Sequence, residues 1–268
     1  MSQHIAPEHG AELDPLPYAS FDHAFREVVA AHRVKKTKAL LHVVFGNIAD
    51  VRGMPVVIPV NESFDLRQRG SRSVLASFEP IYVGKRAFFD YVEETWPTSR
   101  RPTAAGLGNT KYLSLPKNTR DLPGILFVVT TRNLSANTKH YGYYVNTPVE
   151  GIDYIIEHVL DAADAQRLSA IAIPLLGAGY ANIRRTFDQE KLGRLMRQAV
   201  ALLTIQKTER KLADASSVLR RGVVVVFSKE SHSEEEHHLW ESVTRFLGKQ
   251  ERQRQFQLDA LLNEISKA

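Results

Sequence analysis

The chain has 268 residues, 43% of them hydrophobic, which is enough for one large globular α/β domain with a sizeable core. Lys and Arg total 35 against 30 for Asp and Glu, so the net charge of +5 suits an anionic small molecule and does not call for nucleic acid. The lack of cysteine excludes disulfides, thiolate metal sites and a cysteine nucleophile, and no apolar run reaches the ~20 residues of a transmembrane helix. We expect a soluble, cytoplasmic protein.

The first ordered element is predicted to begin at Ser20. Residues 1–19 carry three prolines and no periodicity, and this pattern is typical of an irregular arm. Behind Ser20 as a helix N-cap, apolar residues recur at helical spacing. They are Phe21, Phe25, Val28, Val29 and His32. The pattern predicts an amphipathic helix.

Short apolar runs bounded by turn residues predict strands that are covered on both faces. These runs are residues 39–45, 56–60, 111–115, 125–131, 170–175 and 223–227.

Helical patterns alternate with these strands. They lie around Val74, over 88–96, behind capping boxes at Thr147 and Thr186, behind Ser233, and over 249–268. The alternation predicts a three-layer α/β/α sandwich with a mixed, largely parallel sheet. We divide the chain into an arm (1–19), the α/β domain (20–248) and a tail helix (249–268). The apolar stripe of the tail helix could pack on the domain or on another subunit.

Ligands in open α/β sheets bind beyond the carboxyl ends of the strands, so the residues that follow each strand are the candidates for a site. The first strand leads into Gly46, Asn47 and Ile48, and the second into Asn61 and Asp65. The strand over 170–175 leads into Leu176, Gly177, Ala178, Gly179 and Tyr180. Glycines let backbone amides approach a phosphate closely, and Arg184 and Arg185 stand just before the helix capped by Thr186. This arrangement indicates a diphosphate cradle.

Each of these pieces also has a purely structural interpretation. A G-x-G loop is needed in many α/β proteins only to turn the chain. Asn61 can bond its own backbone in a turn, Asp65 can cap the helix around Val74, and Arg184 and Arg185 can be solvated surface residues. The order of the pieces along the chain is what favours a ligand site.

That order resembles the macro-domain family. Its members begin with a strand ending in Gly-Asp-Ile, continue with a strand running into Val-Asn-Ala-Ala-Asn, and later carry Ile-Ala-Phe-Pro before a glycine loop that holds the diphosphate. The counterparts in this chain are Gly46-Asn-Ile48, Val60-Asn61, and Ile171-Ala-Ile-Pro174 followed by Gly177-Ala-Gly179. The resemblance spans roughly residues 38–248 and implies a macro-domain fold that binds an ADP-ribose-like nucleotide.

The closest resemblance is to the sensor domains of Thoeris-type antiphage effectors, which read Val-Asn-x-x-Phe-Asp in the second strand and Ile-Pro-Leu-Leu before the glycine loop. Val60-Asn-Glu-Ser-Phe-Asp65 and Ile173-Pro-Leu-Leu-Gly177 are similar. In that branch the domain binds an ADP-ribose conjugate that a partner TIR-domain enzyme makes from NAD. The resemblance implies a receptor, with no catalytic residues and no cofactor. Those effectors usually carry membrane-spanning helices, so the output step is not implied here.

Departures from the family pattern refine this expectation. Asn47 stands where the family has the aspartate that reads the adenine amino group, and Phe64 stands at the second asparagine, which helps to place the distal ribose in hydrolases. The family's Gly-Gly-Gly-Val loop has no counterpart, and Arg69-Gly-Ser-Arg-Ser73 occupies that region instead. Arg69 and Arg72 could pair with a phosphate or carboxylate or could lie in a solvated turn. These differences favour sensing over hydrolysis.

Other candidate motifs are weaker. His232, His237 and His238 lack an acidic partner for a metal site, and no Gly-x-Ser-x-Gly elbow exposes a serine. The cluster from Thr138 to Tyr144 is either a packed connection or a lid whose Tyr141 or Tyr143 stacks on a base.

Three functions follow from these observations. The first is reversible binding of ADP-ribose or its conjugate, in partnership with a TIR-domain enzyme, with no nucleic acid and no membrane. The second is an ADP-ribosyl hydrolase. The third is an interaction protein that acts, for example, as a homo-oligomer through the C-terminal helix.

Overall fold

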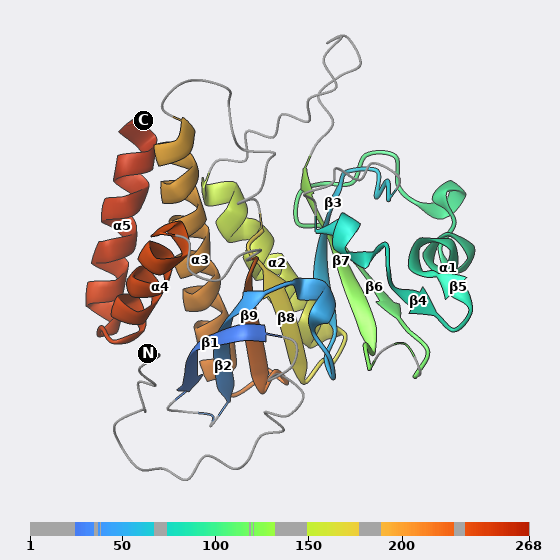
Figure 1. The fold of residues 1–268 in the computed structure, drawn as a ribbon, viewed down its shortest axis with the longest axis horizontal. Helices are drawn as coiled ribbons and strands as arrows, with labels where there is room; N and C mark the ends of the chain where they lie inside the picture. The colour runs from blue at the N-terminus through green and yellow to red at the C-terminus, as the bar shows by residue number, and fades with distance from the viewer. Residues whose placement is uncertain are drawn as a thin grey trace.

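The computed structural model describes residues 25–34, 37, 39–66, 74–117, 119, 121–131, 149–176, 189–227 and 234–267 (Figure 1). The sheet strands are β1 (Phe25–Arg33), β2 (Leu40–Gly46), β3 (Val56–Asn61), β6 (Thr110–Ser114), β7 (Gly124–Thr131), β8 (Ala170–Pro174) and β9 (Arg221–Phe227). The α-helices are α1 (Phe88–Thr95), α2 (Val149–Ala165), α3 (Gln189–Ala213), α4 (Glu234–Leu247) and α5 (Glu251–Lys267). The short elements are the 3₁₀ turns η2 (Ile48–Asp50), η3 (Leu75–Phe78) and η4 (Thr98–Arg100), and the hairpin of β4 (Tyr82–Val83) and β5 (Arg86–Ala87).

The seven strands form one mixed sheet in the order β1-β2-β9-β8-β3-β7-β6. The five inner strands are parallel, and an antiparallel strand closes each edge: β1 pairs with β2, and β6 pairs with β7. Inner strands such as β7 and β9 are buried on both faces, which explains their continuous apolar sequences.

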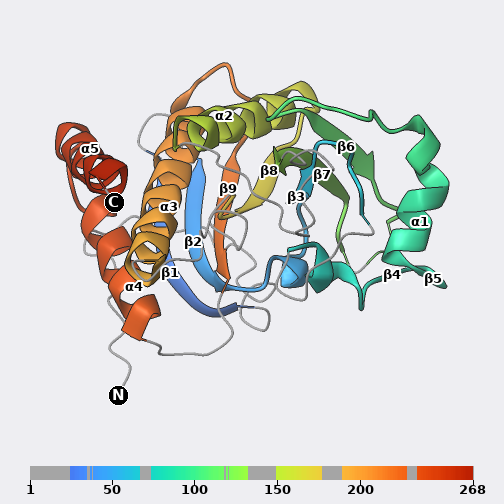
Figure 2. The same ribbon diagram turned by 90° about the horizontal axis from the view of Figure 1, so that it is seen from above.

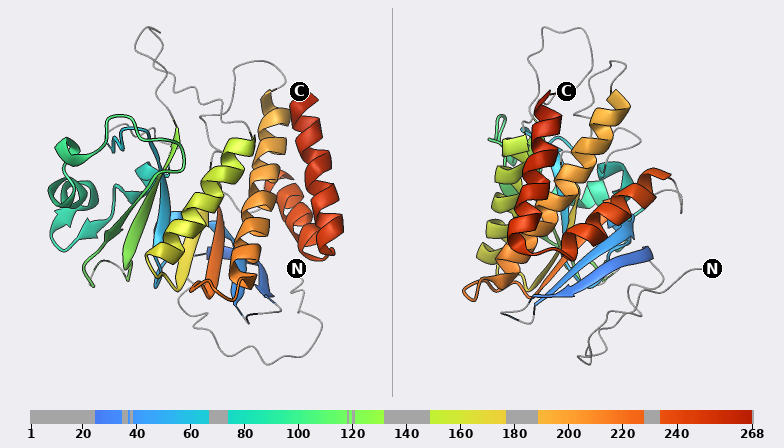
Figure 3. Two further views of the ribbon diagram at one scale, coloured as in Figure 1. Left: turned by 180° about the vertical axis from the view of Figure 1, so that it is seen from behind. Right: turned by 90° about the vertical axis from the view of Figure 1, so that its left-hand side faces the viewer.

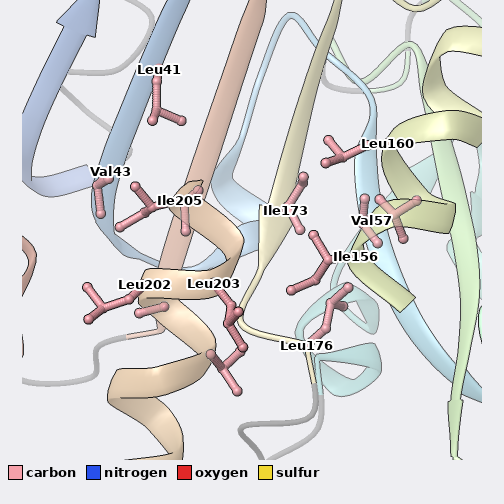
Figure 4. Packing of buried hydrophobic residues seen from close by; sticks show 14 of the residues in the cluster. Leu41, Val43, Val57, Ile156, Leu160, Ile173, Leu176, Leu202, Leu203 and Ile205 are labelled. Carbon is pink, nitrogen blue, oxygen red and sulfur yellow. The ribbon is translucent and has the colours of Figure 1, made fainter. Parts of the chain in front are cut away.

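Helices and turns cover both faces of the sheet (Figure 2). On one face, α2 and α3 contribute Ile156, Leu202 and their neighbours to a core that includes Val43 and Ile173 of the strands (Figure 4). On the other face, α1, η2 and η3 pack against the alternate strand residues. The three-layer α/β/α sandwich with a mixed, largely parallel sheet is therefore confirmed.

The helix predicted from Ser20 is wrong over the described residues, because Phe25–Arg33 is the edge strand β1. Its pairing with β2 has register shifts between Phe25 and Glu27 and between Val28 and Ala30. A bulge adds a residue to a strand and breaks the two-residue alternation, so the apolar residues fall at spacings that imitate a helix. For the helix predicted around Val74, the described residues from Val74 onward contain the short 3₁₀ turn η3, and residues 67–73 lie outside the described residues.

The predicted tail helix exists as α5 and packs against α3 (Figure 3). Leu258 and Leu261 are buried in the same core as α2 and α3. Arg254, also buried, donates to the backbone oxygens of Lys249 and Leu247 and is paired with Glu209 of α3. The apolar stripe of the tail is thus covered by the domain in this structure.

Two buried positions in the sheet constrain its surroundings. A Cβ at Gly222 of β9 would lie 2.4 Å from Cγ2 of Thr208, so glycine allows the close approach of α3. His42 of β2 is 3% exposed, and burial, reinforced by the nearby charge of Arg221, lowers its pKa to about 4. His42 is therefore neutral at physiological pH.

Candidate functional site

The carboxyl ends of the parallel strands bring the predicted site segments to one edge of the sheet (Figure 1). Gly46 is the last residue of β2, Asn61 is the last residue of β3, and Leu176 lies two residues beyond β8. Gly46, Asn61 and Leu176 therefore lie at the same edge of the sheet, which is the edge where ligands of open α/β sheets bind.

The strands β3 and β8 are paired at only one position, which joins the first residue of β3 to the middle of β8. The register holds one pair, Val56 with Ala172, whereas β3 pairs with β7 along its length. The amide of Ala172 donates to the oxygen of Pro55, so Pro59 and Pro174, at even spacings from these residues, face the opposing strand. Proline has no N–H to donate, and prolines on both facing sides therefore leave β3 and β8 without a ladder toward their carboxyl ends. Toward Asn61, the two strands are therefore neighbours in the sheet without the regular hydrogen bonds of a parallel pair.

Two strands, β9 and β8, lie between β2 and β3. At about 4.8 Å per strand, the ends of β2 and β3 are at least about 14 Å apart. A ligand that reaches both Asn47 and Asn61 must therefore be extended, and its middle must pass the residues that follow β8.

Asn61 holds the turn that follows β3. Its side chain is 7% exposed, and Oδ1 accepts hydrogen bonds from the amide of Asp65 (2.8 Å) and from Oγ of Ser63 (3.1 Å). The structural interpretation of Asn61 as a turn residue is thus confirmed. Within the described ranges, Nδ2 donates no hydrogen bond. This nitrogen is the donor that the Asn61 side chain can offer to an acceptor on a ligand.

Phe64 does not take the place of an asparagine in a ligand pocket. It is 2% exposed, and its ring meets Trp96 edge-on with 5.0 Å between the ring centroids. Its backbone φ of 51° lies in the left-handed region, which is unfavourable for a bulky side chain. The aromatic residue therefore anchors the turn to the core.

Asn47 is the N-cap of η2, where its Oδ1 accepts from the amide of Ala49 at 3.1 Å. The same atom is the one that would accept from an adenine amino group, so one of its two acceptor positions is already used. Its Nδ2 donates no bond to the part of the chain that the structure describes. Ile48 is buried in the core, so only its backbone can face a ligand.

The remaining predicted site residues divide into two groups. Leu176 is 1% exposed and packs in the core beside α2, so it can offer only backbone groups (Figure 4). Arg69, Arg72, Gly177, Ala178, Gly179 and Tyr180 lie outside the described residues, as do Arg184, Arg185 and the cluster from Thr138 to Tyr144.

Sequence reasoning missed a polar cluster that supports the turn after β3. Arg101, with 2% of its side chain exposed, donates from Nη1 to the oxygen of Phe64 (3.1 Å), from Nε and Nη2 to the oxygen of Trp96 (3.1 and 2.8 Å), and from Nη2 to Glu93 (2.6 Å). Hydrogen bonding by the backbone amide of Thr98, aided by its hydroxyl and Arg101, lowers the pKa of Glu93. An arginine in a polar, proline-containing segment carries no sequence signal of burial.

The histidines form no metal site within the described residues. His237 lies 3.3 Å from Glu241 and stacks on Trp240, while His232 is outside the described ranges. Across the described segments, no cluster of three His, Asp or Glu side chains could hold a metal ion.

No protein-family model and no curated protein matches the sequence. Solved structures do match the fold. The Oceanobacillus iheyensis macrodomain with ADP aligns with a TM-score of 0.54 and 15% identity, over 81% of this chain and 95% of that one. This chain has the macrodomain fold.

Two further macrodomain structures agree with this result. A mutant of the Oceanobacillus iheyensis macrodomain with ADPR gives a TM-score of 0.53 and 15% identity, over 82% of this chain and 99% of that one. The Trypanosoma brucei macrodomain in complex with ADP gives 0.51 and 11%, over 81% and 74%. Among the helices that the structure describes, none is long and apolar enough to span a membrane.

Proposed function

We propose that this chain binds ADP-ribose, or a conjugate of it, across the carboxyl ends of β2, β8 and β3. The observation that carries the proposal is the placement of Asn47 and Asn61 at the carboxyl ends of β2 and β3, with the end of β8 between them in the sheet. Macrodomain structures with ADP and with ADPR support the choice of ligand. The net charge of +5 favours the diphosphate.

Each part of the ligand has a proposed contact. Asn47 and the backbone of Ile48 receive the base, and Nδ2 of Asn61 donates to a ribose oxygen, with Asp65 on the same turn. Backbone amides from Gly177 to Tyr180 cradle the diphosphate between them. Arg69 and Arg72 pair with an anionic group of the ligand.

Binding without turnover is the form of the proposal that the turn after β3 supports. The side chain of Phe64 is buried against Trp96, so it cannot place a ribose or a water as a polar residue would. We propose further that the site senses a conjugate made from NAD by a TIR-domain enzyme in antiphage defence. This proposal is supported by the sequence motifs from Val60 to Asp65 and from Ile173 to Gly177.

Calorimetry with ADP-ribose, AMP and ribose 5-phosphate tests the binding proposal. Because each fragment covers only part of the span between Asn47 and Asn61, we expect both to bind at least about tenfold more weakly than ADP-ribose. Absence of heat and of a thermal shift with ADP-ribose would overturn the proposal.

Turnover is tested separately, by release of ADP-ribose from ADP-ribosylated protein. We expect none. Release that disappears in Asn61→Ala would replace the receptor with a hydrolase. The sensing role is tested with the products of a TIR-domain enzyme and NAD, one of which should bind more tightly than ADP-ribose itself.

A further inference from the structure

We infer that Arg101 is a positioning residue for the ligand site, which fixes the turn from Asn61 to Leu66 without touching the ligand. The inference rests on the proposed binding of ADP-ribose at that turn. The shape of this turn depends on the backbone conformation of Phe64.

A phenylalanine at a φ of 51° does not hold that conformation unaided. Such a conformation is strained and persists only where the surrounding structure restrains the residue from several sides. In this turn the amide of Phe64 donates to the oxygen of Asn61 at 2.9 Å, which is a contact within the turn itself. The remaining restraints come from a different part of the chain.

The segment from Glu93 to Arg101 contacts Phe64 at two points. Nη1 of Arg101 binds the carbonyl oxygen of Phe64, and Trp96 contacts its ring. The guanidinium carbon of Arg101 lies 5.2 Å from the centroid of the Trp96 ring, so the two gripping groups also stabilise each other. Farther along, the amide of Ala105 donates to the oxygen of Glu62 at 2.8 Å.

The planar guanidinium suits this role because it divides its donors among three acceptors. It binds Phe64, the backbone oxygen of Trp96 at the end of α1, and the carboxylate of Glu93 at the same time. A lysine ammonium is a compact charge on a flexible stem and cannot reproduce that fork. Arg101 thereby ties the strand-end turn to the end of a helix.

The consequence for the ligand follows from Asn61. Both bonds accepted by its Oδ1 come from the same turn, at Ser63 and Asp65, so the orientation of the amide plane depends on the shape of the turn. The direction of the Nδ2 donor of Asn61 is therefore set by the conformation of the turn. Loosening the turn therefore reduces the fraction of molecules that present this donor correctly, and the apparent affinity falls in proportion.

The test compares Arg101→Lys with Arg86→Lys, a matched control at an exposed arginine of β5 that pairs with Glu94 of α1. If the competent turn falls to about a tenth of the molecules, the Kd for ADP-ribose rises ~10-fold in Arg101→Lys, and it is unchanged in Arg86→Lys. Hydrogen exchange at the amides of Phe64 and Asp65 should accelerate by a similar factor, while β7 amides stay protected.

A purely structural role predicts a different pattern, in which the protection of β7 falls together with that of the turn. That pattern, or a Kd within about twofold of the wild type with normal protection of Asp65, overturns the inference. If Arg101→Lys does not fold, Glu93→Ala replaces it, because Glu93 is half exposed and its truncation removes one of the three acceptors that hold the guanidinium of Arg101. Unchanged exchange at Phe64 and Asp65 in Glu93→Ala then overturns the inference.

The two proposals fail in distinguishable ways. If the wild-type chain does not bind ADP-ribose, the proposed function is wrong. The exchange rates of the Phe64 and Asp65 amides still decide whether Arg101 positions the turn, because they need no ligand.

Discussion

Replacing Asn61 by alanine and by aspartate separates its two roles. Alanine removes the acceptor of the Asp65 amide and of the Ser63 hydroxyl. An amide left without its partner in a partly buried turn costs about 1–3 kcal/mol, which at about 2–4 °C per kcal/mol lowers the Tm by roughly 2–12 °C. Aspartate keeps an acceptor oxygen in the same position, so we expect a Tm within about 3 °C of the wild type.

Affinity for ADP-ribose should respond in the opposite order. Both substitutions remove Nδ2, the donor that the turn leaves unused, and the loss of one donor weakens binding ~10-fold. Aspartate adds a negative charge near an anionic ligand, so we expect it to weaken binding further than alanine does.

Thermal unfolding and calorimetry on the same preparations provide the assay. Wild-type affinity in Asn61→Asp would show that Nδ2 does not contact the ligand. An unchanged Tm in Asn61→Ala would show that Oδ1 does not hold the turn. Either result refutes the account given above for Asn61.

Three further predictions concern other positions. Gly222→Ala should lower the free energy of unfolding in urea by about 1–3 kcal/mol because the new Cβ meets Cγ2 of Thr208. Adding Thr208→Ser deletes that methyl group and should restore most of the lost stability. Additive losses in the double variant would contradict the packing explanation. His42 has a folded pKa of about 4, below its unfolded value, so it contributes ~3 kcal/mol to the free energy of unfolding. This contribution is complete above about pH 6.5 and is lost as the pH falls toward 4. His42→Leu should flatten the pH dependence of stability over that window, and an unchanged slope would exclude His42 as its source. Asn47→Asp retains an N-cap acceptor for Ala49, so the Tm should stay within about 2 °C of the wild type. A carboxylate accepts from an amino group, so the preference for binding ADP-ribose over its hypoxanthine analogue should rise ~10-fold by calorimetry. An equal ratio of the two affinities in both proteins would show that residue 47 does not contact the base.

The sequence was sufficient for most of the architecture because the inner strands are buried on both faces. Runs such as residues 125–129 and 223–227 have no polar interruption, and the structure has β7 and β9 there. The edge strand β1 was not predictable in the same way, because its pairing with β2 is irregular and its apolar residues fall at helical spacing. An edge strand is specified largely by the partner to which it adds.

The candidate site was predictable in its position and less so in its contacts. Parallel strands must end on one edge, so the placement of Asn47 and Asn61 followed from fold class alone. The short pairing of β3 with β8 had a signal in Pro59 and Pro174, but only the pairing order shows that the two prolines lie on the facing sides of these strands. The contact between Arg101 and Phe64 spans 37 positions in the chain and has no local pattern.

The strand order has a consequence for synthesis of the protein on the ribosome. β9, the last strand of the chain, lies between β2 and β8, so the amino-terminal hairpin of β1 and β2 cannot join the rest of the sheet until residue 227 has emerged. Until then the nascent chain exposes two unpaired parallel edges, which are the surfaces most prone to wrong pairing. The loops of Asn47 and Asn61 are thus brought onto one surface only at the end of translation, and a chain truncated before β9 would be an aggregating species without a binding site.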